Sequence, residues 1–126
     1  MCIRDRDMVA ETIQEVMQET KEQGEVKAIG ITGQGDGLWL LDRNKKPLDV
    51  ATLWIDGRAG AYIDRWKQNK VIQSSGRITF AGSPLALGAW YYDHEPEKME
   101  QAKYLVFCKD WIKSVSYTHL DVYKRQ

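Results

Sequence analysis

The chain has 126 residues, of which 43% are hydrophobic, and its 18 basic and 18 acidic side chains balance at pH 7. Without an excess of positive charge, the composition argues against a nucleic-acid-binding protein and against attachment to an anionic membrane. The apolar stretches fall well short of the roughly 20 residues that span a bilayer, and no secretory signal is visible. We therefore expect a soluble, cytoplasmic protein with one hydrophobic core.

Both ends of the sequence differ from its middle. Residues 1–6 (MCIRDR) and 115–126 (VSYTHLDVYKRQ) resemble translated sequencing-adapter read-through, so we treat them as an artefactual leader and tail and expect the domain in residues 7–114. A genuine basic tail is the alternative. The ends hold four basic and two acidic residues, which leaves 14 basic against 16 acidic side chains. Only Cys108 and His94 then remain of their kinds, which argues against a disulfide framework, a Cys/His zinc site and a Cys-His nucleophile pair.

The first half of the middle region predicts a helix and three strands. Apolar residues recur at helical spacing from Val9 to Met17, with Gly24 as a natural stop, which predicts an amphipathic helix whose apolar stripe faces a core. The apolar run at 26–32 is typical of a strand buried on both faces, and a helix leading into such a strand predicts a parallel α/β crossover. Residues 38–41 and 50–55 predict two adjacent antiparallel strands joined by an exposed connection.

The second half predicts three helices and one strand. The apolar residues from Ala59 to Trp66 have the spacing of a helix with one buried stripe. Residues 104–108 predict a second parallel strand, and 109–111 begin a final helix.

Between these elements, Ser83 and Pro84 fit the cap and first turn of a helix that ends at Glu95-Pro96. Its apolar side is expected to carry Leu85, Ala89 and Tyr92, widened by Leu87, Trp90 and Tyr91. The adjacent aromatic residues 90–92 are therefore interpreted as core and helix flank rather than as a cofactor site.

The stretch Gly33-Gln34-Gly35-Asp36-Gly37 directly follows the predicted buried strand. It lacks the glycine spacing of the dinucleotide fingerprint and is followed by an apolar strand, and the sequence has no P-loop lysine signature. The glycines permit close approach of a ligand to the backbone, where the Gln34 amide and the Asp36 carboxylate can grip sugar hydroxyls. The alternative is a tight turn between strands in which Asp36 binds its own backbone.

A second stretch, Trp54-Ile55-Asp56-Gly57-Arg58, follows another predicted strand. In a ligand site, Trp54 supplies a flat wall for a carbon chain, while Asp56 and Arg58 hold hydroxyls or each other. In a purely structural interpretation, Trp54 belongs to the core and Asp56 is the N-cap of a helix that begins near Arg58. Residue types and spacing alone leave both interpretations open.

The order and spacing of these stretches form a longer pattern. It comprises residues 28–42, Pro47, residues 53–58, residues 76–90, residues 94–97 and Lys109-Asp110. This pattern resembles the N-terminal domain of the FGGY carbohydrate kinases over essentially all of residues 7–114. The resemblance implies an α/β fold, part of a ribonuclease H-like, actin-like ATPase domain with a mixed sheet flanked by helices. It also favours the ligand-binding interpretation of the glycine stretch.

The resemblance implies a substrate site. In the family, the two positions after the one that matches Gln34 contact the substrate, and here they are Gly35 and Asp36; the tryptophan that matches Trp54 lines the same pocket. At the positions of Gly35 and Asp36, glycerol kinases carry arginine and glutamate, and xylulose kinases typically carry methionine and histidine. This chain is closer to the pattern of erythritol and L-xylulose kinases.

A further position bears on the size of the substrate. Glycerol kinases carry a tyrosine where this chain has Gly82, whereas xylulose kinases carry glycine, so we expect an opened pocket and a four- or five-carbon substrate. Family members often carry a lysine where this chain has Leu87. This difference argues against polar contacts between this helix and the substrate. The expected substrate-binding residues are Gln34, Gly35, Asp36, Trp54, Asp56, Arg58 and Gly82.

By this resemblance the chain is a fragment of an ATP-dependent kinase that phosphorylates a small polyol or ketose of the erythritol, xylulose or L-xylulose type. The family's phosphate-binding turn is expected before Asp7, and its catalytic base and adenosine site after Ser114. The fragment is therefore expected to be catalytically incomplete, with ATP and Mg²⁺ bound elsewhere in the parent enzyme. The implied partner is a small sugar or polyol, not a nucleic acid or a membrane. The resemblance is also compatible with a homodimer of the full-length protein. The alternative is a non-catalytic sugar-binding or sugar-sensing member of the actin-like ATPase superfamily.

Overall fold

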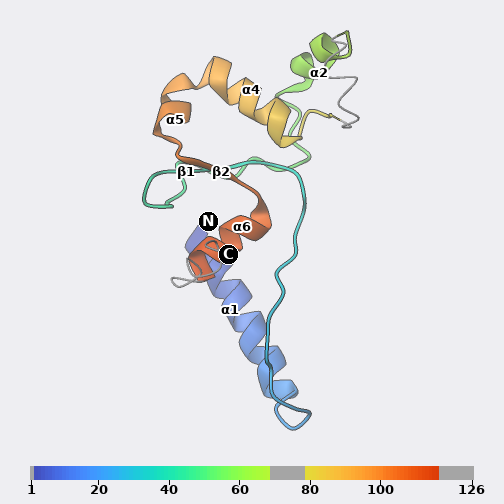
Figure 1. Cartoon of the computed structure of the whole chain (residues 1–126), viewed down its shortest axis with the longest axis vertical. Coiled ribbons are helices and arrows are strands. Elements are labelled where there is room, and N and C mark those ends of the chain that lie inside the picture. The colour runs from blue at the N-terminus through green and yellow to red at the C-terminus, as the bar shows by residue number, and fades with distance from the viewer. Residues whose placement is uncertain (1, 69–78, 117–126) are drawn as a thin grey trace, which may run out of the picture. The chain divides into compact units, whose positions relative to one another are not determined.

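The computed structural model describes the backbone of residues 2–68 and 79–116, and the side chains of residues 7–68 and 79–114. Gly76 of the family pattern and residues 117–126 of the expected tail lie outside the described residues. The chain divides into two units, one of residues 1–32 with 112–126 and the other of residues 33–111. Figure 1 shows its elements, which are α1 (Cys2–Glu19), β1 (Trp39–Leu41), α2 (Gly60–Trp66), α4 (Pro84–His94), α5 (Pro96–Gln101), β2 (Tyr104–Val106) and α6 (Cys108–Ser116).

The helix α1 confirms the amphipathic helix predicted in the first unit. It begins at Cys2, within the residues that the sequence set apart as a leader. Val9 and Ile13 are half-buried, whereas Val16 and Met17 are 53% and 48% exposed. The expectation that the whole apolar stripe faces a core is therefore wrong for the C-terminal half of the helix.

Residues 26–32 do not form the predicted buried strand. Val26 and Ile29 are 48% and 54% exposed, and no bridge joins this run to another described segment. A strand is stabilised by hydrogen bonds to a neighbouring strand, which its own composition cannot supply. Both the doubly buried strand and the parallel crossover are wrong here, because the described residues place no strand beside this run.

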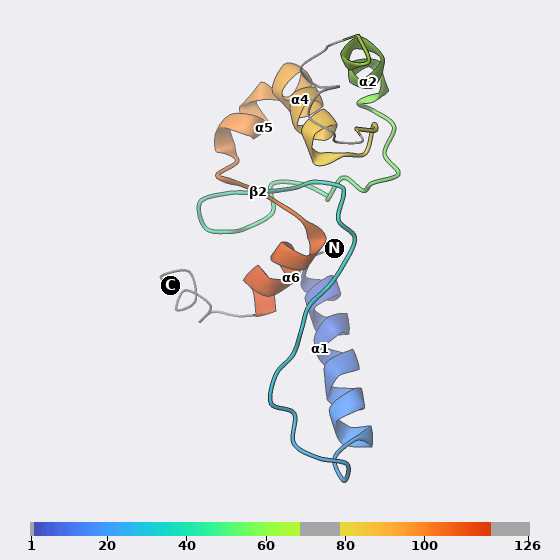
Figure 2. The same cartoon turned by 45° about the vertical axis from the view of Figure 1, so that its right-hand side comes forward.

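The second unit contains a two-stranded sheet of β1 and β2. The strands are antiparallel, with Trp39 opposite Val106, Leu40 opposite Leu105 and Leu41 opposite Tyr104. Figure 2 shows the chain passing from α4 through α5 into β2. It arrives beside the end of β1, where the Lys103 amide donates to the Leu41 carbonyl oxygen at 2.8 Å. The strand expected at 104–108 is confirmed for residues 104–106, whereas Cys108 already begins α6. Its parallel direction is wrong, because the chain enters β2 from the carboxyl end of β1.

Residues 50–55 form one bridge rather than a strand. Thr52 pairs with Leu38 in the predicted antiparallel direction, and their backbone hydrogen bonds measure 2.7 and 3.0 Å. In the connection between them, Asp42 Oδ1 accepts the amides of Asn44 and Lys46 at 2.7 and 2.8 Å. These turn contacts hold the exposed connection that the sequence predicted.

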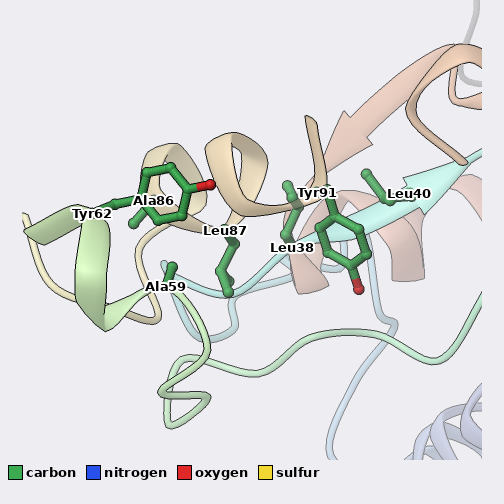
Figure 3. Close-up of a cluster of buried hydrophobic side chains, with 7 residues drawn as sticks. All are labelled: Leu38, Leu40, Ala59, Tyr62, Ala86, Leu87 and Tyr91. Carbon is green, nitrogen blue, oxygen red and sulfur yellow. The ribbon is translucent and has the colours of Figure 1, made fainter. Parts of the chain in front are cut away.

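The core of the second unit lies between α2, α4 and the start of β1 (Figure 3). On α4, the expected apolar side is confirmed for Leu87 and Tyr91, which are buried, and is wrong for Leu85 and Tyr92, which are 58% and 71% exposed. The helix is apolar almost all round, and spacing alone does not select which face is buried. The buried cluster consists of Leu38, Leu40, Ala59, Tyr62, Ala86, Leu87 and Tyr91.

The start of α4 confirms one of its two predicted signals. Pro84 occupies the first turn, as expected. Ser83 stands at the N-cap position without a side-chain cap, and its buried hydroxyl makes no hydrogen bond in the described structure. The predicted break at Glu95-Pro96 and the start of α6 near Lys109 are both confirmed.

Candidate functional site

Three backbone segments of the second unit meet at Gly37, Trp54 and Gly82, which we call the glycine junction. The Gly37 amide donates to the Gly82 carbonyl oxygen at 3.0 Å. Gly37 has a φ of +88°, and a Cβ atom there would lie 2.7 Å from the Thr52 carbonyl oxygen and 3.3 Å from the Trp54 nitrogen. A Cβ atom on Gly82 would lie 1.7 Å from the Trp54 carbonyl oxygen. Only glycine fits at both positions.

The close contact at Gly82 corrects the reason expected for this glycine. The place where its side chain would begin is occupied by the Trp54 backbone, so the glycine leaves no open space in a pocket. The expectation that Gly82 enlarges a substrate pocket is therefore wrong in this structure. Its physical role is to let two backbone segments touch, which fixes Trp54 beside the end of the glycine stretch.

The glycine stretch contains two polar side chains, those of Gln34 and Asp36. Gln34 and Asp36 are half-buried, while Gly33 and Gly35 are exposed. Within the described side chains, the Asp36 carboxylate has no hydrogen bond and no ion pair. The alternative turn in which Asp36 binds its own backbone is thus not found. A half-buried carboxylate without a protein partner is available to accept hydrogen bonds from a ligand.

The Trp54 side chain is not part of the core. It is 53% exposed, and its neighbours Leu53 and Ile55 are 42% and 68% exposed. The core alternative for this tryptophan is wrong, because its side chain remains largely open to solvent although its backbone is held at the glycine junction. An indole face of this kind can pack against the carbon chain of a sugar.

Asp56 and Arg58 bind each other. Asp56 Oδ1 accepts the Arg58 amide at 2.9 Å and Arg58 Nε at 3.0 Å. The side-chain hydrogen bond from Arg58 lowers the pKa of Asp56, and the same bond raises the pKa of Arg58. Helix α2 begins at Gly60, with Ala59 at its N-cap, so the predicted N-cap role of Asp56 is wrong. The carboxylate instead closes a three-residue turn by accepting from the amide two positions further on.

Arg58 also reaches the aromatic residues of α4. Its guanidinium carbon lies 4.7 Å from the centroid of the Trp90 ring and 5.6 Å from that of the Tyr91 ring. Arg58 Nη1 donates to the Tyr91 hydroxyl at 3.4 Å, and that hydroxyl lies 2.7 Å from Thr52 Oγ1. The sequence placed Tyr91 and Trp90 in the core and helix flank and gave no sign of this link. Arg58 and Tyr91 are 33 positions apart, so no short sequence pattern indicates that an arginine and an aromatic ring meet here.

The structure therefore joins some of the predicted site residues and not others. It brings the Trp54 backbone to Gly82, and Asp56 to Arg58. Among the described side chains, no hydrogen bond or ion pair connects Gln34 or Asp36 to these four residues.

The part of the chain that the structure describes contains no group of three or more His, Cys, Asp or Glu side chains suited to a metal ion. No described helix has both the length and the apolar composition needed to cross a membrane.

A family model described as the N-terminal domain of the FGGY family of carbohydrate kinases matches residues 3–117. The chain is 31% identical to a probable L-xylulose kinase of Haemophilus influenzae over 87% of this chain and 24% of that protein. It is 34% identical to an L-xylulose/3-keto-L-gulonate kinase of Escherichia coli over 71% of this chain and 19% of that protein. With an erythritol kinase of Brucella abortus it shares 30% identity over 68% of this chain and 17% of that protein. The chain thus spans about a quarter or less of the length of these curated relatives.

The fold has a counterpart among solved structures. A crystal structure described as a xyloylose kinase from Brucella ovis superposes with a TM-score of 0.72 and 23% identity, over 80% of this chain and 21% of that one. This likeness confirms the expected α/β fold over the matched part of the chain.

Proposed function

Because this chain belongs to the FGGY family of carbohydrate kinases, we propose that it is part of an ATP-dependent kinase that phosphorylates a hydroxyl group of a small polyol or ketose. The observation that carries the proposal is the match to the N-terminal domain of the family over residues 3–117. Relatives named as L-xylulose and erythritol kinases favour a kinase over a non-catalytic sugar-binding or sugar-sensing protein. Erythritol has four carbons, L-xylulose five and 3-keto-L-gulonate six, so these names support a substrate of four to six carbons, without any argument from space at Gly82.

In this proposal, the glycine stretch binds the hydroxyl groups of the sugar. The Asp36 carboxylate accepts hydrogen bonds from hydroxyls, and the Gln34 amide donates to or accepts from them. Gly35 lets the substrate approach the backbone. The support for these roles is that Asp36 is half-buried and makes no hydrogen bond or ion pair among the described residues.

In the same proposal, residues 54–58 contribute a second part of the sugar site. Trp54 covers the carbon chain of the sugar with its exposed indole face. Gly82 holds the Trp54 backbone in place, and the Asp56–Arg58 pair supports the segment that carries the indole. Asp56 and Arg58 therefore belong to the site as supporting residues, since each already binds the other.

The kinase family implies a nucleotide substrate, and we propose ATP with Mg²⁺ for the parent enzyme. ATP supplies the phosphoryl group that is transferred. The described residues do not fit a metal site, because they contain no suitable group of three or more ligating side chains. We therefore assign no described residue of this chain to the metal. In this proposal, the nucleotide site and the catalytic base belong to other parts of the parent enzyme, so we expect the chain alone to be inactive.

The proposed partner is a small sugar or polyol, and the proposal requires neither nucleic acid nor membrane. We propose a cytoplasmic location, where the enzyme can use cytoplasmic ATP. A homodimer of the parent enzyme stays a prediction.

A substrate panel tests the proposed function. The full-length enzyme that contains this sequence is purified and supplied with MgATP and, in separate reactions, erythritol, D-xylulose, L-xylulose or glycerol, while ADP release is followed. We expect sugar-dependent ADP release with kcat/KM at least tenfold higher for erythritol or one of the xyluloses than for glycerol. A preference for glycerol contradicts the proposed substrate size, and no sugar-dependent ADP release contradicts a kinase.

The 126-residue chain, assayed beside a mock preparation, is the control for catalytic incompleteness. Sugar-dependent ADP release by this chain above the mock level would show that it contains the complete catalytic apparatus, against our expectation.

A further inference from the structure

The hydroxyl group of Tyr91 is buried between two distant segments of the chain. Tyr91 extends from α4 and is 3% exposed. Its hydroxyl oxygen lies 2.7 Å from Thr52 Oγ1, and Thr52 is likewise 3% exposed. A polar pair enclosed in this way is stabilising only while both members are present, because a single remaining hydroxyl would be buried without a partner.

The same hydroxyl group also contacts Arg58. Arg58 Nη1 lies 3.4 Å from the Tyr91 oxygen. A guanidinium group can only donate hydrogen bonds, so the Tyr91 oxygen accepts from Arg58 and its own hydrogen remains available for Thr52. One phenol group therefore satisfies two partners that are six positions apart in the sequence.

These two partners are the ends of the segment that carries Trp54. At one end, Thr52 is fixed to Leu38 by two backbone hydrogen bonds of 2.7 and 3.0 Å. At the other end, Arg58 is bound to Asp56 and lies 4.7 Å from the centroid of the Trp90 ring. Tyr91 joins the two ends, so its hydroxyl limits how far residues 52–58 can open or shift.

We propose that Tyr91 is a positioning residue for the sugar site, which holds the Thr52–Arg58 segment through its hydroxyl and thereby places the exposed indole of Trp54. The inference rests on the proposed function, because it assumes that Trp54 borders the substrate. Because Tyr91 is buried, we assign it no direct contact with the sugar. Its effect should therefore appear in the binding of the sugar and not in the binding of ATP.

The test uses the full-length parent enzyme with the substitution Tyr91→Phe, which keeps the ring and removes only the hydroxyl. We expect the KM for the preferred sugar to rise about fivefold, while the KM for ATP changes less than about twofold. The matched control is Tyr92→Phe, the same change on the adjacent tyrosine, which is 71% exposed. It should leave both KM values within about twofold of the wild type. Equal KM values for the sugar in the two variants would overturn the proposal.

A double variant separates positioning from stability. Tyr91→Phe alone leaves Thr52 Oγ1 buried without its partner, whereas Thr52→Val with Tyr91→Phe removes both polar groups. We expect the double variant to regain most of the Tm lost in Tyr91→Phe and to keep the raised KM for the sugar, because the contact with Arg58 is still missing. A KM that returns to the wild-type value together with the Tm would show a merely structural role. A wild-type parent enzyme without sugar-dependent ADP release would instead overturn the proposed function, and the positioning role with it.

Discussion

The two stretches that form the candidate site, residues 33–37 and 54–58, each contain one aspartate. The two aspartates differ in their hydrogen bonds. Asp56 is held by the amide and the guanidinium group of Arg58, at 2.9 and 3.0 Å. Asp36 is half-buried in the glycine stretch, and among the described residues its carboxylate has no partner. A carboxylate that the protein already satisfies serves the architecture, whereas one that the protein leaves free can serve a ligand. We therefore expect substrate selection to depend on Asp36 and the shape of the site to depend on Asp56.

The largest effect should come from the junction that connects the two stretches. Gly82→Ala places a Cβ atom 1.7 Å from the Trp54 carbonyl oxygen, where no flexible side chain can move aside. We expect the full-length enzyme to lose about 3 kcal/mol or more of its free energy of unfolding, since backbone has to shift. Denaturant unfolding measures this loss.

Gly88 provides the matched control for that substitution. It lies inside α4, and a Cβ atom there would meet nothing within 4 Å. Gly88→Ala should stabilise the protein by about 0.5–1 kcal/mol, because alanine favours a helix interior. If the two alanine variants unfold alike, the close contact between Gly82 and Trp54 is not present in the enzyme.

Alanine substitutions at Asp56 and Asp36 should differ in how much they lower the free energy of unfolding, and this effect is smaller than that of Gly82→Ala. Asp56→Ala removes both hydrogen bonds to Arg58 and is expected to cost about 1 kcal/mol of the free energy of unfolding. Asp36→Ala removes no hydrogen bond or ion pair with a described residue and should change the free energy of unfolding by less than about 0.5 kcal/mol. Equal losses in the two variants would contradict the division of roles.

The smallest effect concerns pH. The pKa of Asp56 is lowered from 3.8 in the folded state, chiefly by the side-chain hydrogen bond from Arg58. A lowered pKa contributes stability that is fully present above the unfolded-state value and is lost as the pH falls through the folded-state value. The difference in the free energy of unfolding between wild type and Asp56→Asn should thus be constant above about pH 5 and shrink below about pH 4. A difference that stays the same down to pH 3 would mean that Asp56 is not held by a charged bond.

The sequence predicted those features that depend on neighbouring residues. The helical spacing from Ala59 to Trp66, Pro84 in a first turn and the break at Glu95-Pro96 all have local causes, and the structure contains the corresponding elements. The likeness to the family likewise depends on a linear pattern, and the match over residues 3–117 confirms it.

Features that depend on distant partners were not predictable in the same way. Residues 26–32 have the composition of a strand but no strand beside them in the described structure, and β2 runs antiparallel because of where the chain re-enters the sheet. The buried face of α4 is set by its contacts with β1 and α2, since both faces are apolar. In the site, the sequence singled out Gly82 but assigned it an open pocket, because the backbone of Trp54 that fills this space lies 28 positions away.

The most direct test of the division between the two aspartates is the KM for the preferred sugar in Asp36→Ala and Asp56→Ala of the full-length enzyme. Loss of a hydrogen bond to a charged group predicts a KM about 10- to 100-fold higher in Asp36→Ala. Loss of a supporting contact predicts an increase of no more than about fivefold in Asp56→Ala. A KM that rises as much in Asp56→Ala as in Asp36→Ala, or more, would contradict the assignment of substrate selection to Asp36.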